Sequence, residues 1–183
     1  ITINGIDIRE RPLDAKRQFG YVPDNPDMFL RLKGMEYLNF MADMYNVESS
    51  LRMRRIQELS ESFEMEAALN DQIQSYSHGM RQKIVIMGVL IHDPSVWILD
   101  EPMTGLDPKS SFTLKEMMKN HAAAGKTVFF STHVLEVAEK LCDKVAIINK
   151  GKLMFYGTMD EIREHFRSNE SLEKIFLELT ENE

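Results

Sequence analysis

The sequence has a single cysteine, Cys142, among its 183 residues, so an internal disulfide is excluded. It has no apolar run close to the ~20 residues that cross a bilayer, and no charged-then-apolar leader. Basic residues are in the minority, 22 against 29 acidic ones, and the net charge of -7 argues against binding nucleic acid through a basic surface. Apolar residues make up 43% and charged residues 28%, as in an ordinary globular protein. We therefore expect a cytoplasmic globular protein that does not bind nucleic acid.

Short apolar runs alternate with helical patterns along the chain. Three segments have the continuous apolar character of buried strands: Phe19–Val22, Val96–Leu99 and Lys126–Ser131. Helices are predicted over four segments. Apolar residues recur at helical spacing in residues 35–47 and 51–69, residues 79–92 are apolar over much of their length, and residues 110–123 are more polar. This order predicts an α/β fold with a mostly parallel sheet and an inserted helical block. A functional site is expected at the carboxyl ends of the strands.

The chain is predicted to divide into four parts. These are a partial core over residues 1–24, a helical subdomain over 25–76, the main core over 77–158 and C-terminal helices over 159–183. Asn4-Gly5 and Asn149-Lys150-Gly151 lie between short strand-like segments, and such residues favour hairpin turns.

The strongest local pattern is the apolar strand that ends in two carboxylates, Asp100 and Glu101. An acidic residue at a strand end is well placed to hold Mg²⁺ through water, because this ion keeps much of its hydration shell. The neighbouring carboxylate can polarise or deprotonate an attacking water. A strand that merely leaves the core into a polar loop explains this segment about equally well.

Three further segments each indicate a contact with phosphate or a partner. Ser77 and Gly79 precede a helix, whose free N–H groups would bind an anion, although a plain helix cap gives the same pattern. His133 follows a strand and can donate a hydrogen bond to phosphate, although a surface histidine is the commoner explanation. Asp107, in Gly105-Leu106-Asp107-Pro108, also fits an ordinary turn.

In their order and spacing these four segments resemble the ATP-binding cassette (ABC) ATPases, over essentially the whole chain. The resemblance implies a P-loop NTPase-like fold that binds ATP and Mg²⁺. It makes Asp100 the Walker B aspartate and Glu101 the catalytic glutamate. It makes His133 the switch histidine and Asp107 an aspartate at the dimer interface. Ser77 and Gly79 would belong to the signature, which contacts the nucleotide of a second cassette.

The resemblance also implies partners. Two cassettes would pair head to tail, and residues 25–75 would dock on a membrane permease subunit. The protein is therefore expected at the cytoplasmic face of the membrane. The signature form Tyr76-Ser77-His78-Gly79-Met80 and the stretch Ser171–Thr180 resemble exporters whose membrane subunit is a separate chain.

Asp24 departs from the family pattern, because most members have glutamine at this position after the strand. An ionised aspartate can still ligate Mg²⁺, but it cannot donate a hydrogen bond. We expect Asp24 to ligate the metal. It would not donate the hydrogen bond through which glutamine takes part in coupling to the membrane subunit.

A P-loop, Gly-x-x-x-x-Gly-Lys-Ser/Thr between a strand and a helix, does not occur in these residues. The one Gly-Lys-Thr sequence, Gly125–Thr127, has Asn120 where the first glycine belongs, and it leads from a helix into a strand. We therefore expect a truncated cassette, without its N-terminal strand and P-loop, that hydrolyses ATP only when completed.

Two other functions are left open. One is a soluble cassette that acts on nucleic acid, although such proteins carry coiled-coil insertions or tandem cassettes, and the net acidity is unfavourable. The other is a regulatory module that has no P-loop and does not hydrolyse ATP. Glu101 and His133 argue against this second alternative, because a non-catalytic module needs neither.

Overall fold

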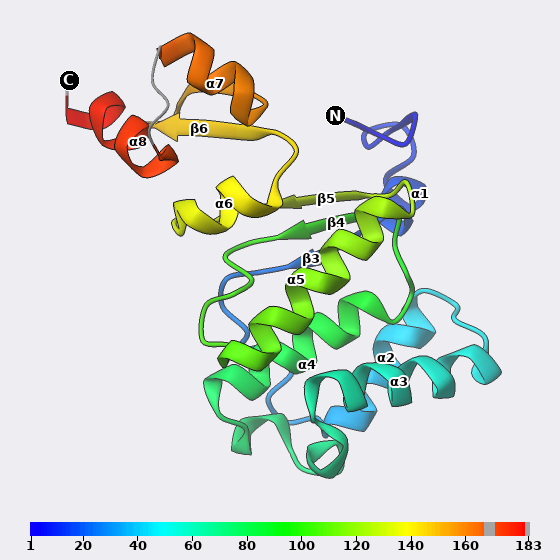
Figure 1. The fold of residues 1–183 in the computed structure, drawn as a ribbon. Helices are drawn as coiled ribbons and strands as arrows, with labels where there is room; N and C mark the ends of the chain where they lie inside the picture. The colour runs from blue at the N-terminus through cyan, green and yellow to red at the C-terminus, as the bar shows by residue number, and fades with distance from the viewer. Residues whose placement is uncertain (167–170, 182–183) are drawn as a thin grey trace. The chain divides into compact units, whose positions relative to one another are not determined.

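The computed structural model describes residues 1–166 and 171–181, which fall into two compact units, Ile1–Ser131 and Thr132–Glu183 (Figure 1). Strands and helices alternate through the first unit, so the predicted α/β fold is confirmed. No helix within the described residues is both long and apolar enough to span a membrane. Each unit is described by itself below.

The first unit is built on a three-stranded parallel sheet in the order β3–β4–β5. These strands are Phe19–Val22, Val96–Leu99 and Thr127–Phe130. Val22 lies opposite Leu99, and Leu99 lies opposite Phe130. Because the strands are parallel and in register, their carboxyl ends meet at one edge, where the sequence places its acidic residues.

One face of this sheet is covered by α4 (His78–Leu90) and α5 (Pro108–Ala123) (Figure 1). Gly20 of β3 allows α4 to approach closely, since a Cβ there would lie 2.4 Å from Val89 Cγ1. The indole of Trp97 stacks on His121 of α5, with ring centroids 4.0 Å apart. Burial of apolar surface on this face holds β3 and β4 in place.

The opposite face of the sheet is uncovered within the first unit. Tyr21, Ile98 and Phe129 share this face in register, and Tyr21 and Phe129 are 48% and 64% exposed. The prediction that residues 126–131 form a buried strand is therefore wrong for Phe129. The reason is that β5 is at the edge of the described sheet, and α4 and α5 pack on the other face.

The predicted helical block consists of α2 (Gly34–Met44), α3 (Ser49–Phe63) and two short 3₁₀ helices, η1 (Glu66–Ala68) and η2 (Ile73–Ser75). The helix predicted over residues 51–69 ends earlier, at Phe63, because Glu64 adopts a left-handed conformation with φ of 55°. Tyr37 of α2 packs against Gly88 of α4, where a Cβ would lie 2.5 Å from the ring. The bounds of this block as a subdomain stay a prediction.

The N-terminal residues form a small hairpin, β1 (Thr2–Ile3) and β2 (Ile6–Asp7), followed by the short helix α1 (Pro12–Arg17). Asn4 and Gly5 both have positive φ, 48° and 78°, as a two-residue turn of this kind requires. The predicted hairpin is confirmed.

The second unit contains α6 (Leu135–Leu141), the antiparallel strands β6 (Val145–Asn149) and β7 (Lys152–Gly157), α7 (Met159–Phe166) and α8 (Leu172–Glu181). Lys150 and Gly151 turn the chain between the strands with φ of 48° and 77°, which confirms the second hairpin. Its core is formed by Val145, Ile147, Ile162, Leu172 and Ile175. Within the C-terminal helices predicted over 159–183, residues 167–170 and 182–183 lie outside the described residues.

Candidate functional site

The two carboxylates predicted at the sheet edge are held there by neighbouring strands. The backbone N–H of Asp100 donates to the carbonyl of Val22 at 2.8 Å, which continues the β3–β4 ladder past Leu99. The N–H of Ser131 donates to the carbonyl of Leu99 at 3.0 Å, which continues the β4–β5 ladder. Asp100 and Glu101 therefore leave the sheet between the ends of β3 and β5.

Ser131 contacts both acidic residues through one hydroxyl. Its Oγ donates to Asp100 Oδ1 at 2.6 Å and accepts the backbone N–H of Glu101 at 2.9 Å. We call Asp100, Glu101 and Ser131 the carboxylate site. The sequence analysis assigned no role to Ser131. Its position beside Asp100 could have been predicted, because Ser131 follows β5 at the edge of the sheet where Asp100 follows β4.

Glu101 has an uncommon backbone conformation for a residue with a side chain. Its φ is 44°, in the left-handed region, and its carbonyl accepts from Thr104 N–H at 3.0 Å to close a turn. The turn sends the chain sharply away from the sheet. The backbone therefore changes course at Glu101, whereas Asp100 still continues the strand.

The predicted signature segment, Tyr76–Met80, packs against the loop after Glu101. A Cβ on Gly79 would lie 2.5 Å from the carbonyl oxygen of Gly105, and a Cβ on Gly105 would lie 2.3 Å from the His78 ring. Gly105 also has a φ of 76°. Two glycines thus allow two segments that are distant in sequence to form one continuous surface.

Ser77 and Asp107 are both helix caps. The Ser77 hydroxyl accepts from Met80 N–H at the start of α4, at 3.3 Å. The Asp107 carboxylate accepts from the N–H and the hydroxyl of Ser110 at the start of α5, at 2.9 and 2.7 Å. The helix cap that the sequence left open as the alternative for Ser77 is therefore present. At Asp107 the alternative was an ordinary turn, and the structure has a helix cap there. A cap does not exclude a further contact of the same residue.

Asp107 also forms an ion pair with Lys83 of α4, at 2.8 Å. The hydrogen bonds from Lys83 and Ser110 hold the pKa of the Asp107 carboxyl well below its usual range. Sequence reasoning missed Lys83, although it lies four residues after Gly79 and therefore on the same side of the helix. The pair fixes α5 to α4 beside the signature segment.

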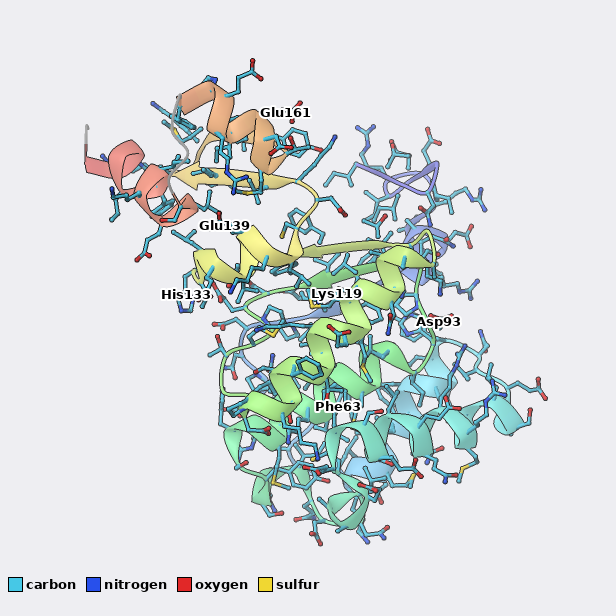
Figure 2. The ribbon with its side chains drawn as sticks, in the orientation of Figure 1. Phe63, Asp93, Lys119, His133, Glu139 and Glu161 are labelled. Atoms are coloured by element: carbon cyan, nitrogen blue, oxygen red, sulfur yellow. The ribbon has the colours of Figure 1, made fainter. Side chains whose placement is uncertain are left out.

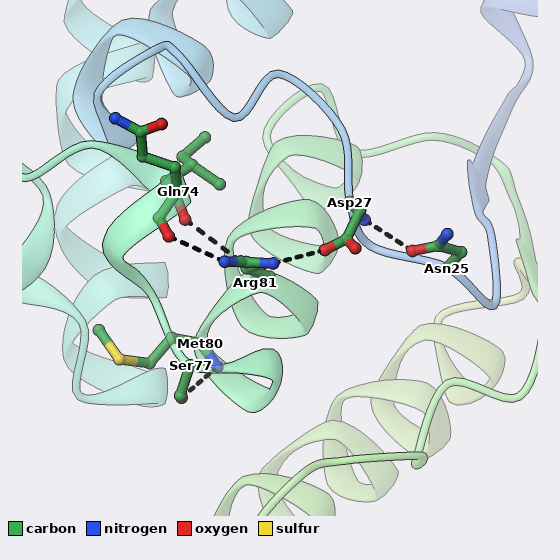
Figure 3. A network of polar contacts seen from close by, with 7 residues as sticks. Asn25, Asp27, Gln74, Ser77, Met80 and Arg81 are labelled. Carbon is green, nitrogen blue, oxygen red and sulfur yellow. Dashed lines mark hydrogen bonds and ion pairs between the residues drawn. The ribbon is translucent and has the colours of Figure 1, made fainter.

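The loop that follows β3 is tied to α4 by Arg81 (Figure 3). The Arg81 guanidinium forms an ion pair with Asp27 at 2.8 Å and donates to the carbonyls of Ile73 and Gln74. Asp24 lies in the same loop, is exposed, and follows Val22, whose carbonyl accepts from Asp100. Asp24 and Asp100 thus leave adjacent strands at the same edge of the sheet.

His133 belongs to the second unit, where it precedes α6 (Figure 2). It is exposed, and it follows Ser131 by two residues. The structure therefore brings Asp100, Glu101 and Ser131 together. It also brings the predicted signature segment, Tyr76–Met80, against the loop that carries Asp107. His133 lies in the second unit.

A magnesium ion fits the carboxylate site by its donor chemistry. Among the described residues, no group of three or more His, Cys, Asp or Glu side chains could hold a metal by itself. Magnesium does not need one, because it retains waters and commonly takes one or two carboxylates together with phosphate oxygens. The described side-chain hydrogen bond of Asp100 uses Oδ1.

Comparison with known proteins identifies the family. Residues 1–104 match the ABC transporter family. The ABC-type transporter ATP-binding protein EcsA of Bacillus subtilis is 35% identical over all of this chain and 74% of its own length.

The chain belongs to the ABC transporter ATP-binding family.

Other members agree in sequence and fold. A solved ATP-binding subunit of an ABC transporter superposes on 97% of this cassette with a TM-score of 0.93 and 34% identity, over 75% of that chain. A dimeric ATP-binding cassette bound to ADP and phosphate, MJ0796, gives a TM-score of 0.74 over 86% of this chain and 72% of its own. At 21% identity, this second likeness supports the fold alone.

The cassette spans only part of its relatives. An uncharacterized ABC transporter ATP-binding protein of Nostoc is 38% identical over 80% of this chain, but that match covers 44% of the relative's length. The predicted membership in the ABC ATPases and the predicted parallel α/β core with a helical region are confirmed. The roles of individual residues are developed below as proposals.

Proposed function

We propose that this cassette supplies the hydrolytic carboxylates of an ATP-driven transporter. The observation that carries the proposal is the carboxylate site, where β3, β4 and β5 hold Asp100 and Glu101 side by side at the carboxyl edge of a parallel sheet. In this arrangement Glu101 would accept a proton from the attacking water or polarise it, and His133 would donate a hydrogen bond to a phosphate oxygen.

The metal is proposed to be Mg²⁺, held through water by Asp100 and ligated by Asp24. Mg²⁺ would supply positive charge that neutralises the phosphate oxygens. Asp100 and Asp24 follow adjacent parallel strands, which supports a shared role. Because the hydroxyl of Ser131 already donates to Oδ1 of Asp100, the carboxylate is oriented before a metal arrives.

A second cassette is the proposed partner of the signature surface. Ser77 and Gly79 would contact the nucleotide held by that cassette, and Asp107 would lie at the interface. The support is the close packing of Gly79 on Gly105, which joins the signature and the Asp107 loop into one surface. MJ0796, whose fold is similar, is described as a dimer bound to ADP and phosphate.

The phosphate cradle is proposed to come from a strand–loop–helix unit that is not among these residues. The sequence contains no P-loop, and the sheet has one apolar face that nothing covers in the first unit, with Tyr21 and Phe129 exposed. Parallel sheets are almost always covered on both faces, so this face is suited to receive such a unit. The chain alone is therefore proposed to be inactive.

A membrane permease is the proposed second partner, and it would keep the cassette at the cytoplasmic face of the membrane. The helical block carries exposed apolar side chains next to the loop after β3: Phe29, Phe40 and Met44 are 44%, 41% and 58% exposed. Phe29 and Phe40 also contact each other, with ring centroids 5.5 Å apart. Co-purification of the complete subunit with a membrane protein is expected, and a subunit that never associates with one would contradict this proposal.

The hydrolytic role is tested by Glu101→Gln in the complete subunit assembled with its membrane partner. The amide keeps the shape of the side chain but accepts a proton poorly, so steady-state ATP turnover should fall by about 10²- to 10⁴-fold while nucleotide still binds. Glu116→Gln is the matched control, because Glu116 lies on α5 and its ion pair in the described structure is with the surface residue Lys119. Turnover of Glu101→Gln equal to that of wild type would remove Glu101 from the mechanism.

A further inference from the structure

The hydroxyl of Ser131 connects the end of one strand to both carboxylate residues of the next. A serine hydroxyl has one proton to donate and lone pairs to accept. Here the proton is given to Asp100 Oδ1 at 2.6 Å, and a lone pair accepts the N–H of Glu101 at 2.9 Å. Both partners are thus bound by the same atom, which fixes them relative to each other.

The contact with Glu101 stabilises a conformation that its backbone would otherwise avoid. A non-glycine residue at φ of 44° is in the left-handed region, which is unfavourable for an L-residue. The N–H of Glu101, like other backbone N–H groups at the edge of a sheet, needs an acceptor. Ser131 Oγ is the acceptor that the described hydrogen bonds provide.

The contact with Asp100 uses the oxygen atom that faces β5. The N–H of Ser131 already donates to Leu99 in the ladder, so its Oγ is carried on backbone fixed at the sheet edge. The carboxylate of Asp100 therefore cannot rotate freely about its last torsion without breaking a short hydrogen bond. Its other oxygen, Oδ2, is held in a defined direction.

We propose that Ser131 is a positioning residue for the hydrolytic reaction. Its hydroxyl orients the Asp100 carboxylate toward the metal and holds Glu101 in the backbone conformation that directs its side chain at the attacking water. Ser131 also precedes His133 by two residues in the sequence. This inference rests on the proposed function of Asp100 and Glu101.

The first test reads the contact directly and needs no nucleotide. Hydrogen exchange of the Glu101 amide is measured in this chain as wild type, Ser131→Thr and Ser131→Val. Threonine keeps the hydroxyl, and valine replaces that hydroxyl with a methyl group in the same shape. Exchange at Glu101 should be about 2- to 10-fold faster in the valine variant and unchanged in the threonine variant. The Asp100 amide, which donates to Val22, is the internal control.

The second test measures ATP hydrolysis in the complete subunit assembled with its membrane partner. Ser131→Val should lower kcat by about 10- to 100-fold and raise the Mg²⁺ concentration needed for half-maximal rate, with nucleotide affinity little changed. Ser131→Thr should stay within about 3-fold of wild type on both measures. A residue with only a structural role would not change the Mg²⁺ requirement.

The outcomes separate this inference from the function on which it rests. If Glu101→Gln abolishes turnover but Ser131→Val does not reduce it, the positioning role is overturned and the proposed function stands. Equal Glu101 exchange in the valine and threonine variants overturns it as well. If Glu101→Gln turns over ATP normally, the proposed function fails and this inference fails with it. Loss of turnover in the valine variant alone, with faster exchange at Glu101, supports it.

Discussion

At the scale of single residues, two glycines decide whether the signature segment can lie against the loop after Glu101. Gly79 approaches the carbonyl of Gly105, and Gly105 lies under the His78 ring. Neither position tolerates a Cβ without movement of backbone or ring. The proposed contact surface for a second cassette therefore depends on these two residues before any phosphate-binding group is considered.

Gly105→Ala is expected to destabilise the protein by about 2–4 kcal/mol, from the strain of its positive φ and the clash with His78. Gly125→Ala is a matched control, since its φ of 79° is similar but nothing lies within 4 Å of its added Cβ. The control should lose only about 1 kcal/mol. Urea unfolding measures both, and equal losses would show that the Gly105–His78 contact is absent.

The residue pattern predicts some parts of the site and not others. Asp100 and Glu101 could be placed from sequence because a short apolar run fixes where a strand ends, and parallel strands bring their ends together. The Ser131 and Lys83 contacts could not, because each joins residues from different elements. A hydrogen bond of this kind depends on register and rotamer, which one sequence does not specify.

At the scale of elements, α4 organises the site through its first two turns. Ser77 caps the helix, Arg81 reaches the loop after β3, and Lys83 reaches Asp107. One helix end is thereby tied to the loop that carries Asp24 and to the start of α5. Movement of α4 would be transmitted to both neighbours.

Arg81→Ala is expected to destabilise the protein by about 1–3 kcal/mol, because the partly buried guanidinium makes an ion pair and two further hydrogen bonds to carbonyls. Arg54→Ala is the matched control: Arg54 pairs with Glu58 at 3.6 Å on the surface and should cost less than about 0.5 kcal/mol. Chemical unfolding gives both values. Hydrogen exchange should also become faster in residues 24–28 of the Arg81 variant alone, and unchanged exchange there would contradict the tie.

Element boundaries were predicted well where local chemistry sets them. The hairpins at Asn4-Gly5 and Lys150-Gly151 follow from turn residues that accept positive φ. The end of α3 at Phe63 was missed, because Glu64 enters the left-handed region without the glycine that usually marks such an end. The exposure of Phe129 was missed because an apolar run indicates a strand but not what covers it.

At the scale of the whole molecule, the proposed nucleotide site is divided. The carboxylate site, the proposed signature surface and the proposed switch histidine, His133, are on this chain, whereas the sequence contains no P-loop pattern. The uncovered face with Tyr21 and Phe129 is where the missing unit is proposed to pack. Carboxylates near a triphosphate repel it unless a metal and a cationic cradle are present, so this half should not bind nucleotide by itself.

The measurement that tests this division most directly is a calorimetric titration of MgATP into the 183-residue chain, with its folded state checked by circular dichroism. The account predicts binding weaker than about 1 mM, in contrast to the complete subunit. Saturable binding of one MgATP per chain at micromolar concentration would contradict it, since these residues would then hold a phosphate cradle of a kind that the sequence does not reveal.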